Sequence, residues 1–330
     1  MTTPPDDRVQ ALIACGLAER HARFLALVLV HAGVCLRRQY SAHEGVRRGR
    51  TAHAFLAALC ARGWASAYPA HRRAHIYHVH GKPLYRAIGE PDSRLRKPTT
   101  LGRAIERLML LDAVLGEPQL RWLGSAREKT TYFAAKTGMR PEELPRLRFG
   151  DGPAKTTRAF PDRLPIGLAP DGRTYVFLYC VTREHPPELR AFLHRHQALL
   201  RALPEWELRL VLPRHLAQAV TRCKRVAQEE LTRPLRLDAI WELHAYFEAR
   251  RRVEYGATPA DPVAYERQRR EYRAPRFFAL YRSWLQEGDA ILEAQASSAL
   301  ADAVDRDRGR ITSVVLPYPY QHLEQVAGTA

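Results

Sequence analysis

The order of apolar and polar positions in the first quarter of the chain predicts three helices followed by a hairpin. Residues 18–33 and 49–64 each carry an apolar stripe with the period of an α-helix, and the second stripe ends at a glycine. The short polar segment 37–49 between them has room for one small helix. Residues 64–89 read as two strands around a turn. Helix, helix, helix and hairpin is the order of a winged helix-turn-helix.

The pattern then changes twice. Residues 99–116 and 120–138 are amphipathic and predict two more helices. From residue 156 apolar strands alternate with helices. The turn Pro-Asp-Gly-Arg joins the first two strands, so the order is strand, strand, helix, strand, helix in a mixed sheet. The chain beyond Leu231 is helical again and closes with a strand-like run from Gly309. Its later part, residues 314–323, could serve as an edge strand for self-association.

The net charge of the chain limits the classes of partner that it favours. The 330 residues carry 52 Lys and Arg against 35 Asp and Glu, a net charge of +17, and nearly all of the basic residues are arginines. A field of this sign favours polyanions, nucleic acid before an anionic membrane. No apolar run reaches the ~18–20 residues of a membrane helix, and the first residues are too polar for a signal peptide. The five cysteines form no CxxC pair and read as reduced thiols. We therefore expect a cytoplasmic, nucleoid-associated protein that makes no membrane contact.

In a winged helix the third helix enters the major groove and the hairpin tip touches the backbone. Arginines flank the start of the predicted third helix, short polar side chains lie on the face away from its apolar stripe, and two further arginines lie at the hairpin tip. The predicted DNA-binding residues are Arg47, Arg48, Arg50, Thr51, His53, Arg72 and Arg73. Four histidines cluster at the same hairpin, at positions 71, 75, 78 and 80. No cysteine or carboxylate nearby completes a metal site, so we predict neither a metal nor another cofactor.

Residues 265–284 combine arginines with aromatic residues, as nucleic-acid-binding segments do. Here the aromatic side chains fit better as the buried face of a helix in a hydrophobic core, whereas the arginines could face either nucleic acid or solvent. The candidate additional contacts are Arg267, Arg269, Arg270, Arg273 and Arg276.

Residues 160–184 have the outline of a metal-dependent nuclease core, in which an Asp on one strand is joined by an acid-x-Lys triplet on the next. Asp162 follows a proline, as such an Asp should. The next strand, however, carries Tyr179-Cys180-Val181 where the triplet should stand, and Glu184 lies further on. We therefore read a nuclease-like sheet without its catalytic set. An unrelated α/β core with a surface Asp is the plainer alternative.

Two segments resemble the replication-relaxation family of plasmid and conjugative-element proteins. One is Ala18–Gly89, where a helix ending in a Gly-aromatic pair leads into a hairpin. The other is Thr156–Pro213, where Asp162 matches the Asp of the Arg-Pro-Asp pattern, Phe160 replaces its Arg, and residues 179 and 181 replace two acids. The resemblance implies DNA transactions on a mobile genetic element, and the replaced acids mean that the family's metal chemistry does not carry over.

The expected fold class is α+β, with an N-terminal winged helix-turn-helix followed by a small mixed α/β, nuclease-like sheet domain with helical additions. The expected segments are 1–92 (winged helix-turn-helix), 93–155 (helical linker or subdomain), 156–231 (nuclease-like α/β domain) and 232–330 (helical region with a terminal strand). The expected function is sequence-specific binding of double-stranded DNA, without enzymatic activity, as a transcriptional regulator that could form a homodimer. Two alternatives stay open: a metal-dependent nuclease or DNA-processing factor using Asp162 and Glu184, and a non-specific DNA-binding subunit of a nucleoprotein complex.

Overall fold

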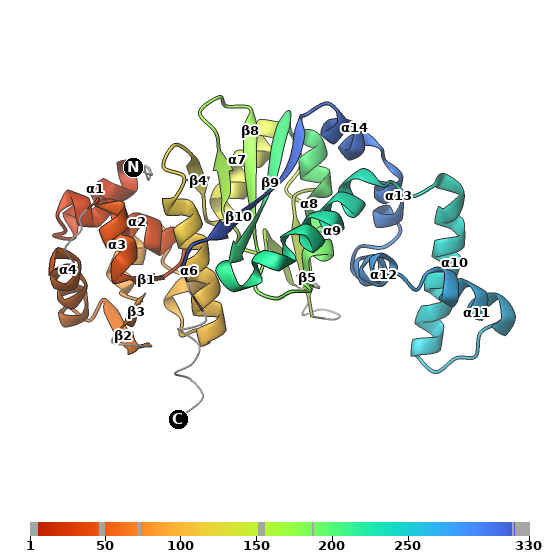
Figure 1. The fold of residues 1–330 in the computed structure, drawn as a ribbon, viewed down its shortest axis with the longest axis horizontal. Coiled ribbons are helices and arrows are strands. Elements are labelled where there is room, and N and C mark those ends of the chain that lie inside the picture. The colour runs from red at the N-terminus through yellow and green to blue at the C-terminus, as the bar shows by residue number, and fades with distance from the viewer. Residues whose placement is uncertain are drawn as a thin grey trace.

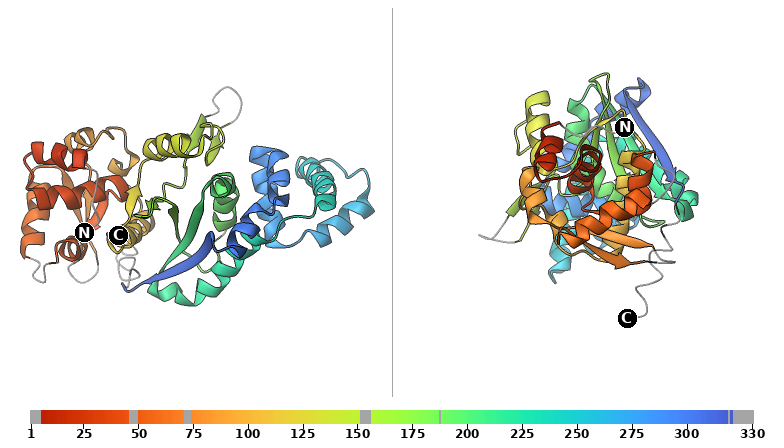
Figure 2. Two further views of the ribbon diagram at one scale, coloured as in Figure 1. Left: turned by 90° about the horizontal axis from the view of Figure 1, so that it is seen from above. Right: turned by 90° about the vertical axis from the view of Figure 1, so that its left-hand side faces the viewer.

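The structure is a computed structural model that describes residues 6–45, 50–70, 74–150, 156–186, 188–318 and 320. It is elongated, with an N-terminal unit at one end, a sheet in the middle and a group of helices at the other end (Figures 1 and 2). The chain is thus mixed α and β, as its pattern predicts. Within the described residues no helix is long and apolar enough to cross a membrane.

The N-terminal unit packs its helices against a three-stranded antiparallel sheet of order β1-β3-β2. The three helices and the hairpin expected from the sequence are confirmed. Three further elements, α1, α5 and β1, are not predicted by the sequence pattern. Strand β1 has only three residues, too few to show a period. The elements are α1 (Asp6–Ala14), α2 (Glu19–His31), β1 (Val34–Leu36), α3 (Arg37–His43), α4 (Arg50–Ala61), β2 (Ala65–Pro69), β3 (His75–Val79) and α5 (Lys82–Ala87).

The central sheet has five strands in the order β10-β9-β8-β7-β4. Strands β8, β9 and β10 run parallel, and β7 and β4 continue the sheet in antiparallel fashion. The expected hairpin is β7–β8, with Ile166 opposite Phe177. The strands are β4 (Arg121–Leu123), β7 (Ile166–Leu168), β8 (Thr174–Cys180), β9 (Glu205–Pro213) and β10 (Gly309–Leu316). They come from three of the four segments expected from the sequence. A separate hairpin, β5 (Arg146–Phe149) with β6 (Thr156–Ala159), stands apart from them.

Helices cover both faces of the central sheet. On β8, Phe177 and Tyr179 point to one face, where their rings meet His196 and Phe192 of α8 (Glu188–Ala202). Successive strand residues point to opposite faces, so Leu178 faces the other side, where α6 (Leu101–Leu115) packs. The first face also carries α9 (Val220–Thr232), which follows a 3₁₀ turn, and α14 (Ala299–Asp305). Helix α7 (Ala126–Thr137) lies beside β6.

The far end of the molecule has a hydrophobic core of its own. Helix α10 (Leu237–Glu254) packs with α11 (Pro262–Glu271), α12 (Pro275–Glu287) and α13 (Ala290–Ala296). Residues buried there include Phe247, Tyr272, Tyr281 and Trp284. The expected core position is confirmed for Tyr272, Tyr281 and Trp284. Phe277 is partly buried against them, and the expectation is wrong for Phe278, which is 45% exposed. We call these four helices the C-terminal lobe.

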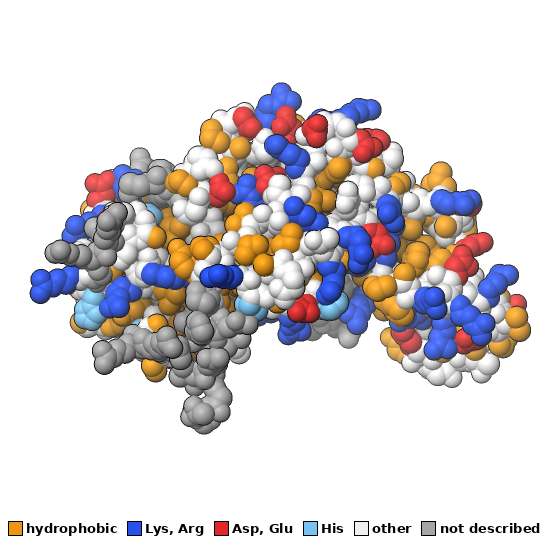
Figure 3. Space-filling model, in the orientation of Figure 1, with side chains coloured by type: hydrophobic (Ala, Val, Ile, Leu, Met, Phe, Trp, Pro, Cys, Tyr) orange, Lys and Arg blue, Asp and Glu red, His pale blue; other side chains and the backbone are white. Residues whose placement is uncertain are grey.

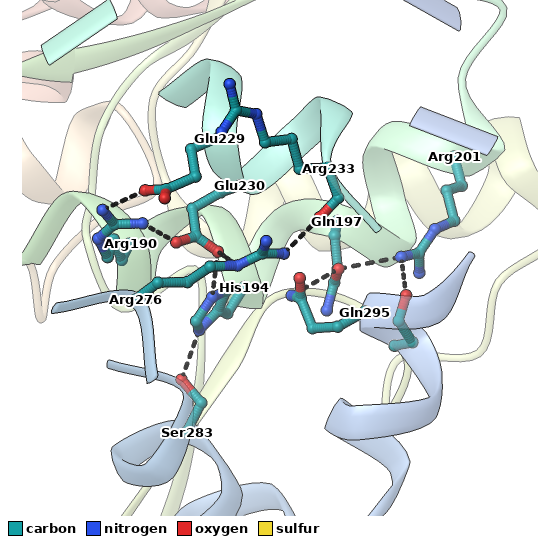
Figure 4. A network of polar contacts seen from close by, with 11 residues as sticks. Arg190, His194, Gln197, Arg201, Glu229, Glu230, Arg233, Arg276, Ser283 and Gln295 are labelled. Atoms are coloured by element: carbon teal, nitrogen blue, oxygen red, sulfur yellow. Dashed lines mark hydrogen bonds and ion pairs between the residues drawn. The ribbon is translucent and has the colours of Figure 1, made fainter. Parts of the chain in front are cut away.

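A buried polar cluster joins the C-terminal lobe to the sheet unit (Figure 4). The carboxylate of Glu230, on α9, contacts the guanidinium of Arg190, lies 3.0 Å from Nε2 of His194 and lies 3.5 Å from Nε of Arg276. Nδ1 of His194 lies 2.9 Å from the hydroxyl of Ser283 on α12. Burial alone would raise the pKa of Glu230, but the His194 hydrogen bond and the two guanidinium charges outweigh it, so the pKa is lowered and the carboxylate stays ionised.

Candidate functional site

Helix α4 divides into a buried and an exposed face. Phe55, Leu56 and Leu59 are buried, and the Phe55 ring packs 5.0 Å from that of Tyr40 on α3. The opposite face is exposed, and four of its six exposed residues are alanines. Its exposed residues are Arg50, His53, Ala54, Ala57, Ala58 and Ala61. An exposed helix face normally carries long charged residues, so this face is unusually able to approach another surface closely.

The predicted DNA-binding residues divide into two groups. Arg50 and His53 are exposed on α4, and Thr51 beside them is half-buried. Three of the seven are therefore brought together on one turn of helix. The other four, Arg47, Arg48, Arg72 and Arg73, lie outside the described residues. The hairpin that carries the last two is closed by a hydrogen bond of 2.8 Å from the amide of Ala70 to the carbonyl of Ala74.

The sequence around α4 is basic and lacks acidic residues. No Asp or Glu occurs between Glu44 and Glu90, a stretch that contains α4 and the β2–β3 hairpin and includes eight Lys and Arg. Arg62, just after α4, is one of these eight and lies over the Trp64 ring at 5.0 Å. Basic and histidine side chains are visible at the lower left of Figure 3, where this part of the molecule lies. A basic stretch of sequence without acidic interruption favours a polyanionic partner.

Two of the four hairpin histidines, His78 and His80, make contacts within the N-terminal unit, and His71 lies outside the described residues. Nε2 of His78 lies 2.9 Å from the carbonyl oxygen of Leu95, and Nε2 of His80 lies 2.9 Å from the hydroxyl of Ser66. Burial lowers the pKa of His78, and the hydrogen bond to Leu95 offsets only part of the effect. His75 is exposed.

The arginines of the C-terminal lobe behave differently from one another. Arg267, Arg269, Arg270 and Arg273 are exposed, and the Arg269 guanidinium forms an ion pair of 2.9 Å with Glu266. Arg276 corrects the expectation for this group. It is only 8% exposed, and its guanidinium donates to the carbonyl of Arg233 at 2.6 Å and faces Glu230. It belongs to the polar cluster and is not a surface contact for nucleic acid.

Asp162 lies in the loop before β7, with both carboxylate oxygens held by Arg195 of α8 at 2.5 and 3.3 Å. Tyr179 and Val181, at the positions where a nuclease needs its acids, are buried. Glu184 is exposed and accepts a hydrogen bond from Gln218 at 3.3 Å. The carboxylate that the nuclease alternative would need as a metal ligand is thus already paired with a cation.

A cleft of about 710 Å³ opens beside Asp162, between α6 and the loop that leads into α8. Glu106, Asp162 and Glu188 line it together with Arg103 and Arg183, whereas Glu184 does not contribute. Within the described part of the chain no group of three or more His, Cys, Asp or Glu is arranged so that it could hold a metal ion.

A buried cation lies close to this loop. Lys129 of α7 is 1% exposed, and its Nζ donates to the carbonyl of Leu164 at 2.8 Å. Burial lowers its pKa to about 8 despite the nearby charge of Asp162. Burial likewise lowers the pKa of His196, on the same side of the sheet, to about 4. Lys129 and His196 are therefore buried and hydrogen-bonded to backbone carbonyls of the protein.

Comparison of the chain with protein-family models, with curated proteins and with solved structures gives no match. The functional interpretation therefore depends on the geometry described above.

Proposed function

We propose that the chain is a sequence-specific double-stranded DNA-binding protein, acting as a transcriptional regulator, and that α4 reads the major groove. The observation that carries this proposal is the exposed face of α4, where Arg50 and His53 stand among alanines in a stretch free of acidic residues. The order α2-β1-α3-α4-β2-β3, with its three-stranded sheet, supports a winged helix-turn-helix with α4 as its third helix.

The chemistry of α4 suits base reading. The major groove is about 12 Å wide and admits one helix, and short side chains let the helix sit deep in it. Alanine methyl groups can contact the thymine methyl, while Thr51 and His53 can hydrogen-bond to base edges. Arg50, at the first turn, would contact a phosphate, and the hairpin-tip arginines Arg72 and Arg73 would contact the DNA backbone.

We further propose that the sheet unit is not a nuclease. The Asp162–Arg195 pair supports this, because a metal would have to compete with a guanidinium bound to both carboxylate oxygens. The resemblance of Ala18–Gly89 and Thr156–Pro213 to the replication-relaxation family is the only support for a role on a mobile element, and it forms part of the proposal.

Fluorescence anisotropy tests the proposal. The probes are a duplex from upstream of the chain's own gene and a scrambled duplex, each titrated over a salt series with Mg²⁺ present. We expect the native duplex to bind at least ~10³-fold more tightly. His53→Ala should cost about 1–3 kcal/mol on the native duplex alone. Arg50→Ala should weaken both duplexes and reduce the salt slope by about 1.

Arg267→Ala is the matched control, because Arg267 is an exposed arginine at the other end of the molecule. It should leave the preference for the native duplex unchanged. Equal binding of both duplexes with a steep salt slope would instead identify a non-specific subunit of a nucleoprotein complex. Shortening of the probe by the wild type, but not by Asp162→Ala, would identify a nuclease.

A further inference from the structure

Strand β10 is the edge of the central sheet and pairs only with β9 among the described residues. It lies at the front of the sheet in Figure 1. Natural edge strands are usually short, charged or interrupted by proline, which prevents pairing with another chain. Strand β10 has eight residues, Arg310 is its one charged residue, and it contains no proline.

The backbone groups on the free side of β10 can be identified from one hydrogen bond. The amide of Trp206 donates to the carbonyl of Arg308 at 2.8 Å, so the backbone groups of residue 308 point toward β9. Because strand residues alternate, residues 310, 312, 314 and 316 also point toward β9. The amides and carbonyls of Ile311, Ser313 and Val315 therefore point away from the sheet.

These outward groups are self-complementary. When two copies of β10 run antiparallel with Ser313 opposite Ser313, Ile311 lies opposite Val315 of the other copy, and Val315 lies opposite Ile311. All three outward residues then meet outward residues, which gives three hydrogen-bonded pairs and about six backbone hydrogen bonds. This register is two-fold symmetric, as a homodimer interface requires.

Side chains and charge favour the same register. Val315 is 40% exposed and would pack against half-buried Ile311 of the other copy, and Val314, 37% exposed, would lie beside Thr312. Arg310 would lie opposite Leu316, so no like charges meet. On its own chain, Arg310 lies near Glu207. Burial raises the pKa of Glu207, but the hydrogen bonds that it accepts from Arg209 and Thr312 and the charges of Arg209 and Arg310 lower it overall.

We propose that two copies of this chain associate through β10, Ser313 opposite Ser313, so that two five-stranded sheets form one continuous sheet. The partner is a second copy because the edge matches itself in hydrogen bonding, in apolar contacts and in charge. The proposal does not depend on DNA binding.

Disulfide trapping tests the register. In a hydrogen-bonded antiparallel pair the Cα atoms are about 5.5 Å apart, within the range that a disulfide spans. Ser313→Cys should therefore cross-link to a dimer under mild oxidation. Arg310→Cys is the matched control: its two copies would lie six residues apart along the strands, about 20 Å, and should cross-link no more than the wild type with its five native cysteines. Equal cross-linking of the two variants, or none, would overturn the register.

A second pair of variants tests the interface. Ser313→Pro removes an outward N–H without removing a bond to β9, and proline is tolerated at such edge positions. Light scattering should give a dimer mass for the wild type and for Ser313→Ala, and half that mass for Ser313→Pro, with unchanged circular dichroism. A wild type that is monomeric at micromolar concentrations, or a Ser313→Pro variant that stays dimeric, would refute the proposal.

Discussion

Replacing Glu230 by glutamine should destabilise the protein strongly, because this carboxylate neutralises two buried cations. Arg190 and Arg276 have side-chain exposures of 11% and 10%, and Glu230 itself has 1%. Glutamine keeps the volume and can accept one hydrogen bond, but it leaves both guanidinium groups with less compensation and deprives His194 of its carboxylate partner. Removing one member of a buried ion pair costs about 3–5 kcal/mol. We expect about 3 kcal/mol for this isosteric change.

Glu229→Gln provides the matched control. Glu229 is the neighbouring residue, contacts the same Arg190 at 2.5 Å, and is 33% exposed. Because solvent screens this pair, its loss should cost about 0–1 kcal/mol. Adding Arg276→Met to Glu230→Gln should recover part of the loss, because it removes one of the uncompensated cations.

Urea unfolding followed by circular dichroism measures these differences in the free energy of unfolding. Limited proteolysis would show whether the C-terminal lobe, which the cluster joins to the sheet unit, loosens first. A loss below about 1 kcal/mol for Glu230→Gln, or equal losses for both glutamate variants, would refute the view that the buried charges hold this junction.

Three other predictions concern the described core. Gly33 (φ 67°) and Gly63 (φ 68°) both adopt left-handed backbone, but a Cβ at Gly33 would lie 2.7 Å from the Leu95 carbonyl oxygen, whereas one at Gly63 would meet open space. In urea unfolding, Gly33→Ala should therefore lower the free energy of unfolding by about 2–4 kcal/mol, and Gly63→Ala by about 1 kcal/mol. Burial lowers the pKa of His31 to about 3, so below pH 6.5 the unfolded chain binds a proton at this residue and the folded chain does not. The free energy of unfolding should therefore fall by about 1.4 kcal/mol per pH unit from pH 6.5 to 3, and His31→Leu should abolish this fall. Lys129, with its pKa near 8, makes stability rise from pH 8 to 10.5, and Lys129→Met should abolish that rise; an unchanged pH profile in either variant would contradict its assignment.

Local signals in the sequence predicted most of the helices and strands, but they could not predict which distant strands pair. Helix α4 and the hairpin β7–β8 follow from an apolar period and a turn that lie within a few residues of one another. The helix expected over residues 120–138 is wrong at its start, because residues 121–123 form strand β4 and the helix begins at Ala126. Strand β4 has three residues and pairs with β7 more than forty residues later, so no local pattern indicates its place. The strand-like run at 309–316 was visible, but its partner β9 lies about a hundred residues earlier in the chain.

The same limit applies to single side chains. The exposed side of α4 follows from the position of Phe55 and Leu59, so Arg50 and His53 could be placed from the sequence. Arg276 could not, because its burial depends on Glu230, which a different helix supplies. Four arginines of an otherwise similar run remained at the surface, and nothing in the spacing marks the fifth as different.

The residues that follow β10 connect the proposed dimer strand to the unit that contains α4. The ring of Tyr318 lies 3.5 Å from the guanidinium carbon of Arg38 on α3, and that guanidinium forms two hydrogen bonds of 2.7 Å with Asp112 of α6. The hydroxyl of Tyr320 also donates to Asp112. These contacts attach the end of the proposed dimer strand to α3 and α6, and α3 packs against α4.

A two-fold axis at Ser313 would therefore set the separation of the two α4 helices as a property of the fold. Half-sites should then recur at one spacing, near a whole number of helical turns of about 10 base pairs. Arg38→Ala would loosen the connection without touching either interface, so it should broaden the tolerated half-site spacing while leaving single half-site affinity unchanged. Unchanged spacing preference in Arg38→Ala would show that other contacts, such as those of α6 with α2 and β1, are sufficient to hold the N-terminal unit on the sheet.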